Sequence, residues 1–366
     1  MKVDHLSLRN YRNIEKETVY FEDGVNFLYG ENAQGKTNIL EAIYFYARGK
    51  SFRSASDREQ LSFGKESYET SLFFEDQKRK QEMSYFFCKG ERIRKRNGVK
   101  IDKISEFIGH FRSVLFFPED LSLVKGGPEE RRNFLNVAIS QCDPLYTKKY
   151  AIYKRCIEQR NFLLRQAQTS GRIDENQLIA WNEPLSESAA FIHLKRKNYI
   201  KILSSHASLF LSNLSNGKEK LSLHYESEVK GEDEKELKNL YFNLFLRETE
   251  KEIKTGFSLF GPHRDDLEIK IGGRSARLYA SQGQQRSIVL SLKMGEGEVS
   301  RTLCGEYPVF LFDDVLSELD EKRRDFLLKE IVGPQIIVTG CDSSLFSPSS
   351  AHMIEVKEGR YVSTHR

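Results

Sequence analysis

The eight residues from Gly30 to Thr37 place two glycines, a lysine and a threonine at the spacing G-x-x-x-x-G-K-T. Glycines at this spacing let backbone N–H groups curl around phosphate oxygens, and the positive end of a following helix attracts the same anion. We expect Lys36 to reach the β and γ phosphates of ATP, and the Thr37 hydroxyl to ligate Mg²⁺. The predicted ATP-binding loop consists of Gly30, Glu31, Asn32, Ala33, Gln34, Gly35, Lys36 and Thr37.

Two adjacent carboxylates, Asp313 and Asp314, end the apolar run YPVFLF. Such a run is typical of a buried parallel strand, and a phosphate-binding loop needs a carboxylate on a neighbouring strand to hold its metal. We assign the Mg²⁺ to Asp313 and predict that Asp314 polarises the attacking water, so that Lys36 and Asp314 are the catalytic candidates. The alternative is an ordinary strand-to-loop turn, in which Asp is common.

A third element, Ser281, Gln282, Gly283 and Gln284, opens an apolar-periodic helix before the acidic pair. A Ser-x-Gly turn at a helix N-terminus is a second anion site by the same amide and dipole effects. One chain cannot easily apply both sites to one nucleotide. We therefore predict contact in trans, in which two copies lie head to tail with each Ser281 turn against the ATP of the other. An ordinary helix start is the alternative.

The elements that position these residues follow from apolar periodicity. A helix is expected over 36–49, directly after a strand, and its apolar residues have i, i+3, i+4 spacing. Two further helices between about 143 and 215 predict a helical hairpin, which a charged surface stretch follows at about 226–239. Strands are expected at 2–13, 18–30, 67–76, 81–102, 256–262, 265–273, 306–315 and 334–340. The α/β part is therefore split by a helical insertion.

The charges cluster although the whole chain carries only +4 over its 366 residues. Residues 77–100 contain nine Lys or Arg and two Glu. This expected hairpin, with its tight Asn97-Gly98 turn, can follow a phosphate backbone, or it can be an edge strand protected by its charges. The candidate DNA-binding residues are Arg92, Arg94, Lys95 and Arg96 in the hairpin, with Lys148 and Lys149 on the first inserted helix. Further basic residues on the two inserted helices are Lys154, Arg155, Arg160, Arg165, Lys195, Arg196, Lys197 and Lys201.

The composition indicates the class and the cellular location of the protein. The 39% of hydrophobic residues can fill a large core, and no run approaches the ~18 apolar residues that a membrane helix needs. The five cysteines, an odd number with no CxxC pair, favour neither a disulfide framework nor a zinc site. The charged N-terminus is unlike a secretory signal. A cytoplasmic protein without a membrane partner is expected.

Taken in order, GENAQGKT, YASQGQQR and FLFDDVLSELD resemble the head domain of the ABC ATPases, in the branch of the structural-maintenance-of-chromosomes (SMC) proteins. LRNYRNIE, FFPEDLSLVKGGPEERRNFLN and GPHRDDLEI resemble more closely the bacterial RecF family, from the first strand to the last. The resemblance implies a P-loop ABC-type ATPase head of the α/β class, split by a mainly helical arm. The expected ranges are 1–140 and 251–366 for the two parts of the head and 141–250 for the arm.

The resemblance also implies a function, namely an ATP-dependent DNA-binding homodimer of recombinational repair. Its ligands would be ATP, Mg²⁺ and duplex, gapped or junction DNA, and its ATPase would be weak and DNA-dependent. RecO and RecR would be partners, and RecA an indirect one, loaded onto gapped DNA. The main alternatives are an ABC transporter subunit, a small-molecule kinase and another SMC-like ATPase.

Motif by motif, the resemblance assigns Gly30 to Thr37 to the Walker A motif and Asp313 with Asp314 to the Walker B motif. Residues 281–284 match the ABC signature and 317–320 the D-loop. Two positions depart from the wider pattern, because Gln282 replaces the first signature glycine and Asp314 replaces the usual Glu. A carboxylate on a shorter stem holds water less closely, which fits a slow ATPase used as a switch.

Other loops carry open assignments. Glu119 or Asp120 is the candidate where ABC ATPases offer a metal-binding Gln, while Thr339 and Asp342 occupy the neighbourhood of the missing switch histidine.

Two further pairs of residues have two readings each. Arg12 and Asn13 are candidates for contact with the base or phosphates of ATP, or they form a solvated loop. His263 and Arg264 reach the nucleotide or the dimer seam, or they belong to a plain turn.

Overall fold

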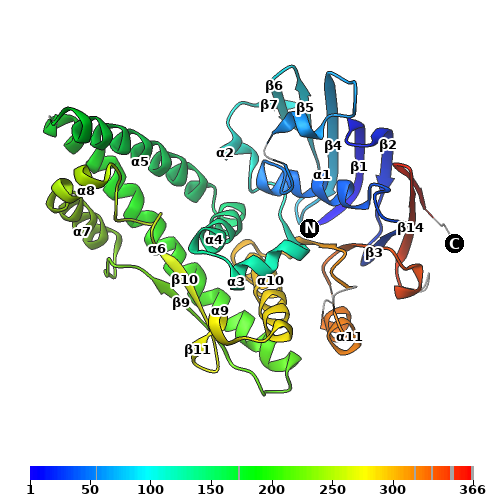
Figure 1. The fold of residues 1–366 in the computed structure, drawn as a ribbon. Coiled ribbons are helices and arrows are strands. Elements are labelled where there is room, and N and C mark those ends of the chain that lie inside the picture. The colour runs from blue at the N-terminus through cyan, green and yellow to red at the C-terminus, as the bar shows by residue number, and fades with distance from the viewer. Residues whose placement is uncertain (55, 172–173, 317–318, 331–332, 347–349, 364–366) are drawn as a thin grey trace.

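The computed structural model describes residues 1–54, 56–171, 174–316, 319–330, 333–346 and 350–363. The chain forms a lobe of two sheets around helix α1 (Lys36–Arg48), and a helical arm extends from one side of that lobe (Figure 1). The N-terminus and the last described residues, up to position 363, lie in the sheet-rich lobe, which we call the head (Figure 1).

A mostly parallel sheet positions the ATP-binding loop. Its strand order is β15-β14-β3-β13-β12-β8, and only β15 runs antiparallel to its neighbour. The bounds are β3 Val25–Tyr29, β8 Ser113–Phe116, β12 Val309–Asp313, β13 Ile336–Gly340, β14 His352–Lys357 and β15 Arg360–Ser363. Strands from both ends of the chain therefore form one sheet, as a split head requires.

The second sheet of the head is antiparallel, in the order β2-β1-β4-β5-β6-β7. Its strands are β1 Lys2–Tyr11, β2 Ile14–Tyr20, β4 Ser67–Glu75, β5 Lys80–Cys88, β6 Glu91–Arg96 and β7 Val99–Ile101. The expected Asn97-Gly98 turn joins β6 to β7 with positive φ at both residues, 48° and 79°. Helix α1 is apolar on nearly all sides because one hydrophobic cluster joins it to both sheets.

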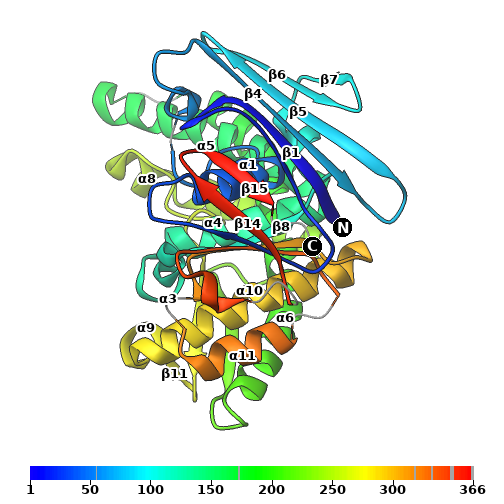
Figure 2. The same cartoon turned by 90° about the vertical axis from the view of Figure 1, so that its right-hand side faces the viewer.

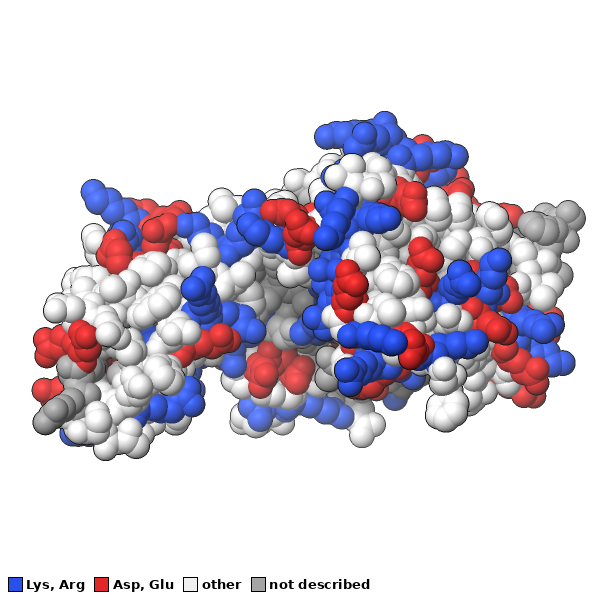
Figure 3. All heavy atoms as spheres, turned by 90° about the horizontal axis from the view of Figure 1, so that it is seen from above, with Lys and Arg blue, Asp and Glu red and all other residues white. Residues whose placement is uncertain are grey.

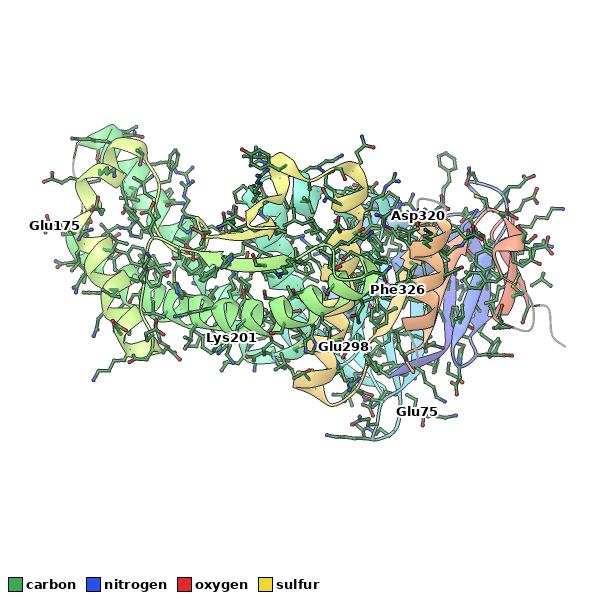
Figure 4. All side chains as sticks on the ribbon, turned by 90° about the horizontal axis from the view of Figure 1, so that it is seen from below. Glu75, Glu175, Lys201, Glu298, Asp320 and Phe326 are labelled. Atoms are coloured by element: carbon green, nitrogen blue, oxygen red, sulfur yellow. The ribbon has the colours of Figure 1, made fainter. Side chains whose placement is uncertain are left out.

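Long helices build the arm, and the turned view in Figure 2 shows α6 and α10 below the sheets. The principal helices are α4 Pro128–Cys142, α5 Pro144–Ser170, α6 Glu175–Leu214, α7 Glu234–Arg247, α8 Thr249–Thr255 and α10 Gln282–Cys304. Helix α6 runs from Glu175 at the far end of the arm past Lys201 toward Phe326 of α11 (Glu321–Glu330), as Figure 4 shows. The rings of Phe210 and Phe326 are in contact there, with their centroids 5.3 Å apart.

Short elements connect these helices and strands. They are η1 Asp57–Gln60, α2 Ile104–Phe107, η2 Pro118–Leu121, α3 Ser122–Lys125, α9 Ala276–Tyr279 and η4 Ser343–Leu345. A small antiparallel sheet of the arm has the order β11-β10-β9, with bounds Arg274–Ser275, Asp266–Ile271 and Leu221–Glu226. None of the helices in the described part of the chain is both long and apolar enough to cross a membrane.

One element prediction was wrong. Residues 256–262 form turns instead of a strand, because Ser258 N donates to the Asn161 side chain of α5 rather than to a strand partner. The charged stretch near 226–239 is exposed at most of its charged residues, as expected, and it also contains the start of α7, which Asp233 caps by accepting from Glu236 N. The division at residue 250 stays a prediction; that position falls inside α8, and β9 pairs with β10 across it.

Candidate nucleotide-binding site

The loop from Gly30 to Thr37 has a shape that requires its glycines. Gly35 has φ 114°, and a Cβ there would lie 2.9 Å from Asn13 Oδ1 and 3.0 Å from the Tyr361 hydroxyl. A Cβ on Gly30 would approach Val356 O to 2.3 Å. Any side chain at either position would collide with neighbouring residues. The loop can therefore adopt this shape, in which its backbone approaches a ligand closely, only if both residues are glycine.

The C-terminal hairpin of β14 and β15 braces this loop. Gln34 O accepts from Gly359 N at 3.0 Å, and the Tyr361 hydroxyl donates to Gly35 O at 3.0 Å. From the opposite side, Asn13 Nδ2 donates to Gln34 O at 3.1 Å. The loop is therefore held between two distant parts of the chain, and Asn13 acts on the loop itself.

Lys36, Thr37 and Asp313 converge at the end of the loop. Lys36 Nζ donates to the carbonyl oxygens of Gly30 and Glu31 at 2.6 and 2.7 Å. Thr37 Oγ1 donates to Asp313 Oδ1 at 2.8 Å. Strand β13 lies between β12 and β3 in the sheet. The expectation that Asp313 ends a strand next to the one before the loop was therefore wrong, although its carboxylate still reaches the loop.

Asp313 is buried and bonded from two sides. Burial raises the pKa of Asp313, while hydrogen bonds from Thr37 and Thr339 act in the opposite direction. Thr339 Oγ1 also accepts from Asp314 N at 3.0 Å, and Asp314 adopts a positive φ of 53°. Thr339 thus hydrogen-bonds to both acidic residues. It occupies the region of the sequence in which ABC ATPases carry a switch histidine. Asp342 lies in an exposed turn, where it caps Ser344 N.

Arg12 and Arg53 flank the loop through a shared buried carboxylate. Arg12 donates to both oxygens of Glu41 on α1, at 2.9 and 2.6 Å. Arg53 donates to Asn38 Oδ1 at 2.9 Å and lines a cavity with Asp313. Sequence reasoning missed Arg53 and Glu41, because neither stands in a recognisable motif and both depend on contacts across the fold.

A cavity of about 610 Å³ leads from Asp313 along α1 toward α4 and α10. Of the two candidates for the metal-binding Gln, Glu119 is exposed on its wall. Asp120 is buried, and its Oδ1 lies 2.9 Å from Lys293 Nζ of α10. Glu119 is therefore the freer of the two to turn toward a ligand.

The Ser281 turn caps its own helix. Ser281 Oγ accepts from Gln284 N at 3.3 Å, and Gln284 Oε1 accepts from Ser281 N at 2.9 Å. Ser281 and Gln282 are exposed, and Gly283 lies near the guanidinium of Arg323. Within the predicted D-loop, Ser317 and Glu318 lie outside the described residues, and Asp320 accepts from Arg323 N at 2.9 Å.

The basic hairpin places its arginines and lysine on different faces. Arg92, Arg94 and Arg96 pair in register with buried residues of β5, so they point to the core side of the sheet. Arg92 ion-pairs with Asp57 at 2.7 Å, and the Arg94 guanidinium lies over the Tyr85 ring. Arg96 Nε donates to Gln81 at 2.8 Å. Lys95 is exposed on the opposite face.

The basic residues on the arm helices divide similarly. Lys148 is exposed, whereas Lys149 ion-pairs with Glu187. The inclusion of Arg160 and Arg196 in a basic surface set was wrong, because both are buried, with exposed fractions of 0% and 1%. Arg160 pairs with Glu252 at 2.6 Å.

His263 and Arg264 belong to a turn in the arm. His263 Nδ1 lies 2.5 Å from the Tyr153 hydroxyl of α5, and Arg264 donates to Ser258 O at 3.3 Å. Burial lowers the pKa of His263 to about 4. These contacts favour the interpretation in which His263 and Arg264 belong to a plain turn.

Comparison with known proteins agrees with this geometry. A family model of the AAA ATPase domain matches residues 1–271. The DNA replication and repair protein RecF of Bacillus velezensis is 38% identical over 99% of this chain and 100% of its own. RecF of Bacillus subtilis is 38% identical over 91% of each chain.

Solved structures agree as well. The recombination mediator protein RecF with ATP matches 99% of this chain and 97% of its own with 33% identity and a TM-score of 0.92. The Smc head domain of Pyrococcus furiosus matches 99% and 96% of the two chains with 16% identity and a TM-score of 0.56, which is a likeness of fold. The predicted ABC-type head and the predicted ATPase are confirmed. The chain therefore belongs to the RecF family of DNA replication and repair proteins.

Proposed function

We propose that the protein is an ATP-gated DNA clamp of recombinational repair, in which ATP binding closes a homodimer on DNA and slow hydrolysis opens it. The observation that carries this proposal is the convergence of Lys36, Thr37 and Asp313 in a chain that also exposes Ser281, whose hydroxyl caps its own helix by accepting from Gln284 N. The phosphate-binding loop of one ATP site is thus formed within the head. The Ser281 turn, which would complete the ATP site of a second copy, lies on the surface.

The residues around Thr37 suit Mg²⁺. Thr37 Oγ1 and Asp313 Oδ1 are hard oxygen donors that already lie 2.8 Å apart, and Mg²⁺ prefers such ligands together with phosphate oxygens. When bound, the ion would supply charge neutralisation between the β and γ phosphates. In this proposal Lys36 leaves the carbonyl oxygens of the loop to pair with the same phosphates. Asp314 orients the attacking water, and Arg53 lies where it can add positive charge.

The second copy completes the site. Ser281, Gln282, Gly283 and Gln284 would meet the γ phosphate of the partner's nucleotide with backbone N–H groups and the positive end of α10. Asn13 would fix the loop, and Arg12 would hold α1 through Glu41 rather than contact ATP directly, a role supported by its bidentate bond.

We assign the clamp to duplex, gapped or junction DNA in the cytoplasm, with RecO and RecR as partners and RecA as the protein loaded. The family of the chain supports this role, since its relatives are named DNA replication and repair proteins. Among the rival functions, an SMC protein would need a long coiled coil. Helix α6, with 40 residues, spans only about 60 Å.

Sedimentation of the protein with ATP, with a short duplex, with both and with neither would test the proposal. The expected result is a monomer that dimerises with ATP and binds the duplex more tightly as the dimer. A protein that hydrolyses ATP yet stays monomeric and ignores DNA would contradict it. Co-purification with a membrane permease would instead support the transporter alternative.

A further inference from the structure

The hollow between the head and the arm is lined by positive charge. It is a cavity of about 520 Å³ whose walls come from the end of α1, from α4 and from α5. Figure 3 shows the depression between the two lobes, with Lys and Arg side chains around it and some Asp and Glu beside them. Its basic residues are Arg48, Lys50, Arg132, Lys154 and Arg196, and its acidic residues are Glu129 and Glu158. We call this cavity the basic hollow.

Three of its cations have no carboxylate partner. Within the described residues, Arg48, Lys50 and Lys154 lie beyond ion-pair distance of every Asp and Glu, including those in the hollow. Arg48 donates only a long bond, 3.4 Å, to Ser51 O, and its Nε is buried without a hydrogen-bond partner. Burial, and then the charges of Arg48 and Lys154, lower the pKa of Lys50. These three like charges therefore lie close together without an ion pair among the described residues, although Glu129 and Glu158 line the same hollow.

The floor of the hollow adds a buried cation, which the charge of Asp265 attracts from beyond ion-pair distance. Arg196 is buried, and its guanidinium donates to three neutral groups: the Tyr146 hydroxyl, Pro262 O and Asn136 Oδ1. Side chains that can donate hydrogen bonds to an anion, among them Asn133 and Thr147, complete the walls. Arg92 of the hairpin contrasts with this arrangement, because it already has Asp57 as its partner.

We propose that the basic hollow binds the sugar–phosphate backbone of duplex DNA, with Arg48, Lys50 and Lys154 as its phosphate contacts. This inference rests on the proposed function and gives the DNA a place in the fold. Cations from the end of α1 and from α5, spread over a cavity much larger than one phosphate, match successive phosphates of a backbone better than a single free anion. Each neutralised phosphate releases counterions, which would offset the repulsion among these side chains.

The basic hollow is also connected to the ATP site. Arg48, Asn133 and Val137 line both this hollow and the cavity that reaches Asp313. Helix α1 begins at Lys36 of the ATP-binding loop and ends at Arg48, so that about 20 Å of rigid helix joins the two sites. A backbone phosphate held at Arg48 would therefore restrain the helix that carries Lys36 and Thr37, and DNA would influence ATP turnover through it.

The test compares two double variants that remove equal charge. Lys50→Ala with Lys154→Ala should weaken ATP-stimulated binding of a 30-base-pair duplex about tenfold or more. It should also lower the slope of log affinity against log salt by about 2, since two phosphate contacts are lost. The matched control is Lys218→Ala with Lys235→Ala, because both lysines are exposed outside the hollow. The control should bind as the wild type does.

A second measurement uses the unaltered protein. Duplex DNA with ATP should protect Lys50 and Lys154 from acetylation while Lys235 stays reactive, and inorganic phosphate or ATP alone should give no such protection. Protection by phosphate alone would identify a free-anion site and overturn the DNA assignment, as would a double variant with unchanged affinity and salt slope. If the wild type itself showed no DNA binding, the proposed function would fail, which is a distinct result.

Discussion

Lys293 of α10 and Asp120 of η2 form a buried ion pair, with Nζ 2.9 Å from Oδ1 and both side chains only 7% exposed. Lys293 also lies over the ring of Phe134 on α4, 5.4 Å from its centroid. Asp120 in turn accepts from Phe117 N at 3.0 Å. The pair therefore ties the loop after β8, which faces the ATP site, to the helix that carries the Ser281 turn.

Breaking this pair should destabilise the head. Lys293→Met leaves Asp120 and Glu296 buried without their cation, and removal of one partner of a buried pair costs about 3–5 kcal/mol. Urea unfolding should show that loss in the free energy of unfolding. The double variant Asp120→Asn with Lys293→Met should recover a large part of it. If the double variant were as unstable as the single one, packing of the lysine stem rather than its charge would be the important contribution.

Glu296, one turn along α10 from Lys293, should make stability depend on pH. Burial raises the pKa of this carboxyl to about 7, against the opposing charge of Lys293. The folded state thus binds a proton more tightly than the unfolded state, whose Glu pKa is about 4.3. The contribution of the group is fully present below about pH 4 and is lost as pH rises through about 7.

Glu296→Gln removes this titration. The variant should therefore gain stability relative to the wild type at pH 8, and the difference should shrink or reverse at pH 5.5. Melting temperatures at both values would measure it, with the exposed Glu91→Gln as the matched control. An equal shift at both pH values would contradict the assigned pKa.

Lys36→Arg should reduce ATP turnover about 100-fold, comparable to the loss of one preorganised donor at a developing charge. A planar guanidinium cannot take the place of a compact ammonium that fits between the Gly30 and Glu31 carbonyl oxygens. Steady-state hydrolysis would measure it, with the exposed Lys78→Arg carrying the same chemical change elsewhere. Undiminished hydrolysis by the Lys36 variant would overturn the phosphate-loop assignment.

Features fixed by local spacing were the ones that the sequence predicted well. Three features depend only on residues that are close in sequence, so the sequence pattern predicts them directly. They are the loop from Gly30 to Thr37, the helix up to Gly49 and the Asn97-Gly98 turn. The contact of Thr37 with Asp313 could also be expected, because the carboxyl ends of parallel strands lie at the same edge of the sheet.

Contacts between distant segments could not be predicted in this way. Tyr361 reaches the loop from 326 residues away, and Arg12 meets Glu41 only because the fold brings the turn between β1 and β2 beside α1. Charge alone was misleading for Arg160 and Arg196, since a basic helix position looks the same whether its side chain faces solvent or a buried polar network. The ion pair with Asp57 distinguishes Arg92 of the hairpin from Arg48, Lys50 and Lys154 of the basic hollow.

Asp314→Asn should preserve ATP binding and slow hydrolysis about 100-fold or more, because an amide cannot accept the proton of the attacking water. Asn suits the experiment since it tolerates the positive φ of 53° at this position. The ATP-bound dimer should then persist longer, as sedimentation after ATP addition would show. Normal turnover by this variant would return Asp314 to the role of a turn residue.

The trans site can be tested at Ser281 because that side chain is exposed and its bonds lie within its own turn. Ser281→Arg places a bulky side chain in a tight anion turn. It should leave ATP binding by each monomer intact while dimerisation fails, and ATP-stimulated DNA affinity should fall with it. Analytical ultracentrifugation with ATP, paired with duplex titrations at two salt concentrations, would measure both effects.

Loss of the helix cap must be separated from loss of the interface. Ser281→Ala removes the capping hydroxyl without adding bulk, at a cost of about 1 kcal/mol. If the turn meets the partner's γ phosphate through its backbone N–H groups, the alanine variant should still dimerise, although more weakly, whereas the arginine variant should not. Equal behaviour of the two variants would place the effect in the stability of α10. An arginine variant that still dimerises on ATP would overturn the trans site, because no room would then be left in the turn for a partner's phosphate.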